Sequence, residues 1–238
     1  TGTGKTTQMR ALIAQMRMRR DRAVVFDLTG AYVEAFYSPQ TDVILNPMDE
    51  RCPSWSVFGE AKNHADFSGI AAALLPADGG GAEPFWMLAA RTLFVETCIK
   101  LIKDGQATNQ ALASRLMMAD LKEVHKMLEN TVADPLTAPE AAKMAESIRA
   151  VFNTNAQALR FLPEGKEPFS IQTWIRNDDK PGSILFITSS HNELVLNRAL
   201  LSLWMNLAVH TLMRLPRTRS LRTWFFFDEV HALHRLPA

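Results

Sequence analysis

The alternation of apolar and polar positions divides the chain into strand-forming ends and a helical middle. Near the N-terminus, residues 6–20 have apolar side chains at helical spacing, and residues 23–28 and 42–45 are short apolar runs typical of buried parallel strands. Near the C-terminus, residues 183–188 and 224–227 repeat the strand pattern. We therefore predict that the two ends build one α/β domain around a mainly parallel sheet.

Between about Phe58 and Gly165 the strand signals disappear and helix-capping signatures recur. Residues 85–103 form a long amphipathic stretch, which predicts a helix ended by Asp104-Gly105. Further helix starts are predicted at Thr108, at Asp120 with Glu123, and at Thr137 with Glu140, the last ahead of a helix reaching about Leu162.

These signals predict three parts: residues 1–57 and 167–238 as the two pieces of the α/β domain, and residues 58–166 as an all-α domain inserted between them. In the last part, Ser190 and Glu193 form a capping box that opens a helix running to about Leu215, before Pro216.

Composition limits the classes of function. The chain is 47% hydrophobic and 21% charged with a net charge of +1, as in ordinary globular proteins, so any nucleic-acid binding depends on local patches or on assembly. The arginine-rich stretches 17–22 and 214–222 are candidates, although such runs are also typical of solvated helix ends and subunit contacts. Cys52 and Cys98 lie far apart without metal-ligand spacing, which fits a reducing compartment.

The run Thr1-Gly-Thr-Gly-Lys-Thr-Thr7 matches the second part of a phosphate-binding loop. Because the first glycine of that motif would precede residue 1, we expect the chain to be a fragment. The expected nucleotide-binding residues are Gly2, Thr3 and Gly4, whose backbone approaches the phosphates, Lys5 on the β/γ oxygens, Thr6 on Mg²⁺ and Thr7 near the α-phosphate.

Asp228-Glu229 follows an apolar run and is the candidate metal and catalytic pair. We expect Asp228 to hold Mg²⁺ and Glu229 to orient or deprotonate the attacking water, although Asp-Glu pairs after a strand also cap helices. No guanine-reading N-K-x-D motif occurs, which favours ATP. Asp27, at the end of a predicted strand beside the nucleotide crevice, is a further candidate ligand; the alternative is a turn-forming role before Gly30.

The chain resembles the TraD/TrwB-type coupling proteins of conjugation and type IV secretion. The resemblance spans nearly all 238 residues, and the ordered series is more specific than any one piece. Its segments are Thr1 to Thr6, Val24-Val-Phe-Asp-Leu-Thr-Gly30, Ile44-Leu-Asn-Pro-Met-Asp49, Trp55, Phe169-Ser-Ile-Gln-Thr-Trp174, Ile184 to Thr188 and Trp224 to Glu229.

The resemblance implies a RecA-like P-loop ATPase core, its sheet incomplete in this fragment, with an inserted all-α domain. It further implies an ATP- and Mg²⁺-dependent motor that pumps single-stranded DNA and couples the relaxase and relaxosome to a type IV secretion channel. The expected assembly is a homo-hexamer at the cytoplasmic face of the bacterial inner membrane, anchored through a region absent from this fragment.

Two other classes of function remain open from the residues. A different DNA translocase of the FtsK/HerA kind shares both nucleotide motifs but lacks a large helical insertion at this place. An ATP-gated docking ATPase would recruit protein substrates to a secretion system without moving DNA.

Overall fold

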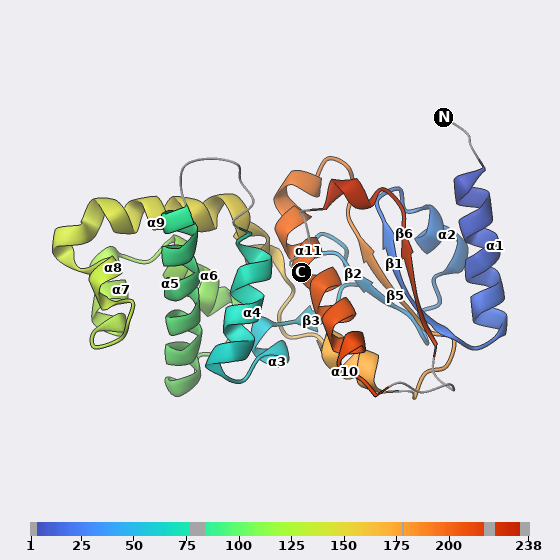
Figure 1. Ribbon diagram of the computed structural model, residues 1–238, viewed down its shortest axis with the longest axis horizontal. Coiled ribbons are helices and arrows are strands. Elements are labelled where there is room, and N and C mark those ends of the chain that lie inside the picture. The colour runs from blue at the N-terminus through green and yellow to red at the C-terminus, as the bar shows by residue number, and fades with distance from the viewer. Residues whose placement is uncertain (1–3, 77–83, 178, 217–221, 234–238) are drawn as a thin grey trace.

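The computed structural model describes residues 4–76, 84–177, 179–216 and 222–233 of the 238-residue chain (Figure 1). Its α-helices are α1 Lys5–Met18, α2 Ala31–Phe36, α3 Val57–Glu60, α4 His64–Leu74, α5 Pro84–Lys103, α6 Asn109–Met117, α7 Leu121–Leu128, α8 Asp134–Thr137, α9 Ala142–Asn155, α10 Ile171–Arg176 and α11 Leu194–Met213. Three short 3₁₀ helices are η1 Pro139–Ala141, η2 Gln157–Phe161 and η3 Val230–Ala232. The strands are β1 Arg22–Asp27, β2 Val43–Leu45, β3 Ser54–Trp55, β4 Pro168–Phe169, β5 Ile184–Thr188 and β6 Thr223–Phe227.

The main sheet has the strand order β2-β5-β1-β6, and every pairing in it is parallel. This confirms the predicted α/β class and the four predicted strands. The sequence did not predict the short parallel pair of β3 with β4, or helix α2, because two-residue strands and a six-residue helix are too short to show a periodicity.

Alternate residues of the strands face opposite layers. Val25 and Phe186 pack with α1 and α2 on one face, whereas Phe26 and Ile187 belong to the core that includes α11 on the other. Burial on both faces explains the unbroken apolar runs of β1 and β5, whose residues are all buried. In Figure 1, α1 and α2 lie to the right of the sheet and α11 to its left.

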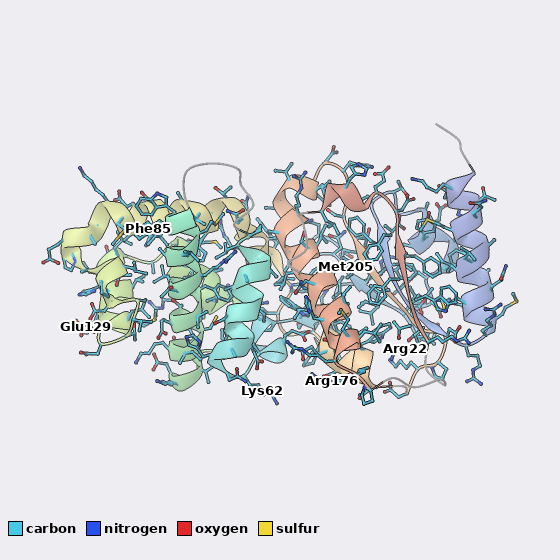
Figure 2. The ribbon with its side chains drawn as sticks, in the orientation of Figure 1. Arg22, Lys62, Phe85, Glu129, Arg176 and Met205 are labelled. Carbon is cyan, nitrogen blue, oxygen red and sulfur yellow. The ribbon has the colours of Figure 1, made fainter. Side chains whose placement is uncertain are left out.

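Helices α4 to α9 lie beyond α11 on the side away from α1 (Figure 1). One continuous apolar core runs from the sheet through α11 into this helical part, and α11 packs against α4 as well as β5. Met205 of α11 is fully buried and lies between the sheet and the helical part (Figure 2). The division of the chain at residues 58 and 166 stays a prediction. Within the described residues, no helix has the length and apolarity that crossing a membrane requires.

The capping predictions have different outcomes. Thr108 and Asp120 are N-caps of α6 and α7, as predicted, and Ser190 and Glu193 exchange the hydrogen bonds of a capping box ahead of α11. The predicted start at Thr137 is wrong.

Thr137 is the last residue of α8, and its hydroxyl donates to the carbonyl of Asp134. Helix α9 begins only at Ala142, after Pro139 opens a 3₁₀ turn. Because Thr137 lies within α8 and Ala141 is the N-cap of α9, the Thr137 side chain does not cap the following α-helix. The long helix expected to reach Leu162 instead ends at Asn155 and continues as η2.

Glu60 ties the segment that enters the helical part to the segment that leaves it. Its side chain is buried and lies between β3, which precedes it, and α10, which starts 111 residues later. The two oxygens accept hydrogen bonds from Nε1 of Trp55 at 2.9 Å, Oγ of Ser170 at 3.1 Å, and the N–H groups of Ile171 at 2.6 Å and Gln172 at 3.2 Å. The carboxylate thereby satisfies the free N–H groups at the start of α10.

Replacing Glu60 with Gln should lower the free energy of unfolding by about 2–4 kcal/mol at neutral pH, because one acceptor oxygen becomes an amide that faces buried donors. Urea denaturation measures this change. Glu146→Gln on the exposed surface of α9 is the matched control and should change stability by less than about 0.5 kcal/mol. Equal stabilities of the two variants would contradict the assigned role of Glu60.

Glu60 should also impose a pH dependence on stability. Burial raises the pKa of Glu60 above its ordinary value of 4.5, so the folded protein holds a proton more tightly than the unfolded chain. The contribution of Glu60 to the free energy of unfolding is therefore fully present below pH 4.5 and is lost as the pH rises through the folded-state pKa. The stability difference between wild type and Glu60→Gln should therefore narrow as pH rises from about 4.5 to 8 in urea titrations. A difference that widens over this range would contradict the raised pKa.

Candidate nucleotide-binding site

The N-terminal end of α1 has the features of an anion site. Gly4 is its N-cap with a φ of 71°, a left-handed conformation that favours glycine, and no side chain caps the helix. The first turn contains no acidic residue, so the positive end of a 14-residue helix is left uncompensated. The predicted ligands Gly2 and Thr3 lie outside the described residues.

Lys5 and Asp228 meet although 223 positions separate them. The parallel pairing of β1 with β6 places Phe26 opposite Phe227. Asp228, the residue after β6, therefore lies beside the end of β1 and close to the start of α1. Nζ of Lys5 lies 3.4 Å from Oδ1 of Asp228. The Lys5 side chain is 63% exposed and the Asp228 side chain only 11%, so the lysine can move toward a ligand while the carboxylate is held in place.

Tyr32 completes this cluster, and the sequence analysis did not identify it. Its hydroxyl donates to Oδ2 of Asp228 at 3.0 Å and lies 3.4 Å from the Met9 sulfur. The side chain is fully buried, and burial with the neighbouring Asp228 raises the pKa of Tyr32 to about 12, while a hydrogen bond with Thr6 acts in the opposite direction. Tyr32 is therefore a neutral donor to Asp228, one of the two predicted metal ligands.

Asp27 serves the turn between β1 and α2. Its Oδ2 accepts hydrogen bonds from the N–H groups of Tyr32 at 2.8 Å and Val33 at 3.1 Å, and its Oδ1 accepts the N–H and hydroxyl of Thr29. The carboxylate is fully buried and caps α2, which is the turn-forming alternative considered from the sequence. A direct contact of Asp27 with nucleotide stays a prediction.

Glu229 has a φ of 56°, an uncommon conformation for a residue with a side chain. It turns the chain out of β6 and into η3, whose Ala232 donates back to the Glu229 carbonyl at 2.9 Å. The residue is half-buried, and its carboxylate makes no hydrogen bond or ion pair with any other residue that the structure describes. The strained backbone thus presents a free carboxylate next to Asp228.

The arrangement fits a magnesium ion held by few protein ligands. Thr6 and Asp228 supply hard oxygen atoms that share Tyr32 as a neighbour, and Thr7 is exposed at the same helix start. No group of three or more acidic, histidine or cysteine side chains that could enclose a metal occurs among the described residues. Mg²⁺ bound by one or two side chains together with nucleotide phosphates matches this donor set.

Part of the first arginine-rich stretch serves the fold. Arg17 is paired with Asp42 at 2.5 Å, and Arg22 is 3% exposed, stacks on Trp174 at 3.8 Å and donates to the carbonyl of Trp174. Arg22 lies at the end of the sheet opposite the nucleotide site (Figure 2). Of the arginines within residues 17–22, Arg19 and Arg20 are exposed, and residues 217–221 of the second stretch are outside the described ranges.

The fold and the site together define a P-loop nucleotide-binding class: a RecA-like α/β core, with a lysine at a glycine-led helix start and a carboxylate at the end of a neighbouring parallel strand. Within this class, the chain belongs to the family described as the type IV secretion-system coupling protein DNA-binding domain, whose model matches residues 1–238.

Individual relatives agree with the family assignment. Coupling protein TraD of Escherichia coli (strain K12) is 33% identical over 241 residues, which covers 99% of this chain and 34% of TraD. The plasmid coupling protein TrwB, solved with the ATP analogue ADPNP and with ADP and Mg²⁺, is 31% identical with a TM-score of 0.86 in both structures. Each match covers 99% of this chain and 56% of the TrwB chain, so the chain spans about a third of one relative and just over half of the other.

Asp27→Asn should lower the free energy of unfolding by about 1–3 kcal/mol, because an amide nitrogen would replace an acceptor of the α2 N–H groups. Asp104→Asn is the control: Asp104 forms a surface pair with Lys100 at 3.4 Å, worth at most about 0.5 kcal/mol. Chemical denaturation compares the two variants. Unchanged stability with lost nucleotide binding would instead indicate that Asp27 contacts the nucleotide directly.

Proposed function

We propose that this chain is the ATPase part of a coupling protein that moves single-stranded DNA from a relaxosome into a type IV secretion channel. The observation that carries the proposal is the Lys5–Asp228 pair at the uncapped start of α1, in a chain that the coupling-protein family model matches from end to end. The bound ADPNP, ADP and Mg²⁺ of the TrwB structures support ATP and Mg²⁺ as ligands at the same place.

The chemical roles follow from the site. Lys5 would exchange its contact with Asp228 for the β/γ phosphate oxygens, and the free N–H groups at the start of α1 would bind phosphate with Gly2, Thr3, Gly4 and Thr7. Thr6 and Asp228 would hold Mg²⁺, which neutralises charge on the phosphates during transfer. Glu229, whose carboxylate has no partner among the described residues, would orient the attacking water and accept its proton.

The helical part favours a coupling protein over other DNA translocases. In the described part of the chain, seven α-helices, α3 to α9, lie between β3 and β4, whereas a translocase of the FtsK/HerA kind is expected to lack such an insertion. In this proposal, residues 58–166 form the inserted domain that meets the relaxase at the cytoplasmic face of the inner membrane. The proposed assembly is a homo-hexamer that is anchored through a region outside this chain. One subunit has a net charge of only +1, and the assembly would bring the positive side chains of several subunits together to bind DNA phosphates.

The test is ATP turnover by the full-length protein with and without single-stranded DNA. We expect DNA to stimulate turnover, and Lys5→Ala to reduce it at least about a hundredfold because phosphate stabilisation is lost. Glu229→Gln should retain ATP binding but slow turnover by about 10²–10⁴-fold, as expected for loss of a general base. Lys62→Ala, an exposed lysine near the start of α4 (Figure 2), is the control and should turn over ATP like wild type.

The outcome separates the candidate functions. Turnover that ignores DNA but responds to a purified relaxase would favour the protein-docking alternative. Wild-type activity in Lys5→Ala would contradict the nucleotide site itself.

A further inference from the structure

We propose that Tyr32 is a positioning residue for the magnesium-binding site, holding the carboxylate of Asp228 in place through its hydroxyl. This inference rests on the proposed nucleotide site. Its basis is that the phenol donates to Oδ2 of Asp228 at 3.0 Å from a fully buried side chain. Tyr32 belongs to α2, which follows β1, so it links the first part of the chain to the carboxylate that follows β6.

The position of the hydroxyl is fixed from two sides. At the backbone, Asp27 holds the N–H groups of Tyr32 and Val33, which sets the first turn of α2 against the end of β1. At the ring, the apolar layer formed by α1, β1 and β5 encloses Tyr32, leaving it 0% exposed. A side chain held at both its backbone and its ring loses few rotamers when it forms a hydrogen bond, so it can orient a flexible partner.

The two oxygens of Asp228 have separate partners. Oδ1 faces the 63% exposed Lys5 at 3.4 Å, whereas Oδ2 faces the buried Tyr32. When phosphate draws Lys5 away, Tyr32 still fixes the carboxylate, and Oδ1 becomes available to a ligand. Hydrogen-bonded partners behind metal-binding side chains set ligand orientation in this way. Asp27 would thereby act on the site through Tyr32 without touching the nucleotide.

The experiment compares Tyr32→Phe with Tyr37→Phe in the full-length protein. These are the two tyrosines of the 238 residues, and Tyr37 follows α2 with its ring against Phe186, away from Thr6 and Asp228. Binding of a fluorescent ATP analogue is titrated in EDTA and then against increasing Mg²⁺. Mg²⁺ should increase the affinity for the ATP analogue. We expect Tyr32→Phe to raise the Mg²⁺ concentration that gives half of this increase by about tenfold. Affinity in EDTA should stay within about twofold of wild type, and Tyr37→Phe should match wild type throughout.

A purely structural role predicts a different result, because loss of packing would weaken binding equally with and without Mg²⁺. That result, or an unchanged Mg²⁺ dependence in Tyr32→Phe, would overturn the inference while leaving the nucleotide site intact. Absence of Mg²⁺-dependent binding in wild type would overturn the proposed site together with it.

A second measurement keeps the hydroxyl in place, in case Tyr32→Phe does not fold. Incorporation of 3-fluorotyrosine at position 32 gives one ¹⁹F resonance that reports on the environment of the phenol. We expect this resonance to shift when Mg²⁺ joins the nucleotide-bound protein, because Asp228, which accepts the hydrogen bond of the phenol, then binds the ion. A resonance that responds to nucleotide but not to Mg²⁺ would contradict the positioning role.

Discussion

The parallel register of β1 with β6 is the constraint on which the site depends. Pairing Phe26 with Phe227 brings the end of the last described strand beside the turn that opens α2, and places Asp228 over the start of α1. Parallel strands deliver their carboxyl ends to one edge of a sheet, so residues at opposite ends of the sequence converge there. A shift of one residue in this register would reverse which face each side chain of β6 occupies and remove Asp228 from Lys5.

The helical part is joined to the sheet by polar as well as apolar contacts. Glu60 binds the start of α10, and Asn109 donates to the Trp55 carbonyl at 2.7 Å while accepting the N–H of Val57. Around these hydrogen bonds, Trp55 packs edge-on against Trp204 of α11 with ring centroids 5.6 Å apart. Buried polar groups with several partners set a specific geometry, because their loss leaves desolvated donors. These contacts therefore hold the helical part against the sheet in one specific arrangement.

The nucleotide site combines rigid and adaptable components. Asp27, Tyr32 and Asp228 are buried and hydrogen-bonded to one another or to the backbone, whereas Lys5 is largely exposed and Glu229 has a free carboxylate within the described structure. A site whose carboxylate is fixed and whose lysine is exposed to solvent needs little reorganisation to accept an anionic ligand. The left-handed backbone of Glu229 is an uncommon conformation that stores strain in the turn after β6.

The sequence by itself determined the α/β class and the four strands of the main sheet, because these features are encoded in local periodicity. From its motifs it also predicted Lys5, Thr6 and Asp228 as site residues, and the structure places Lys5 beside Asp228. It also indicated the caps at Thr108 and Asp120, whose partners lie within three residues. Only the tertiary structure decided that Thr137 serves α8, that Asp27 caps α2 and that Tyr32 reaches Asp228. The physical reason is that each of these roles depends on which of several available partners a polar group meets after the chain folds. Tyr32 and Asp228 are 196 residues apart, so no local pattern records their contact.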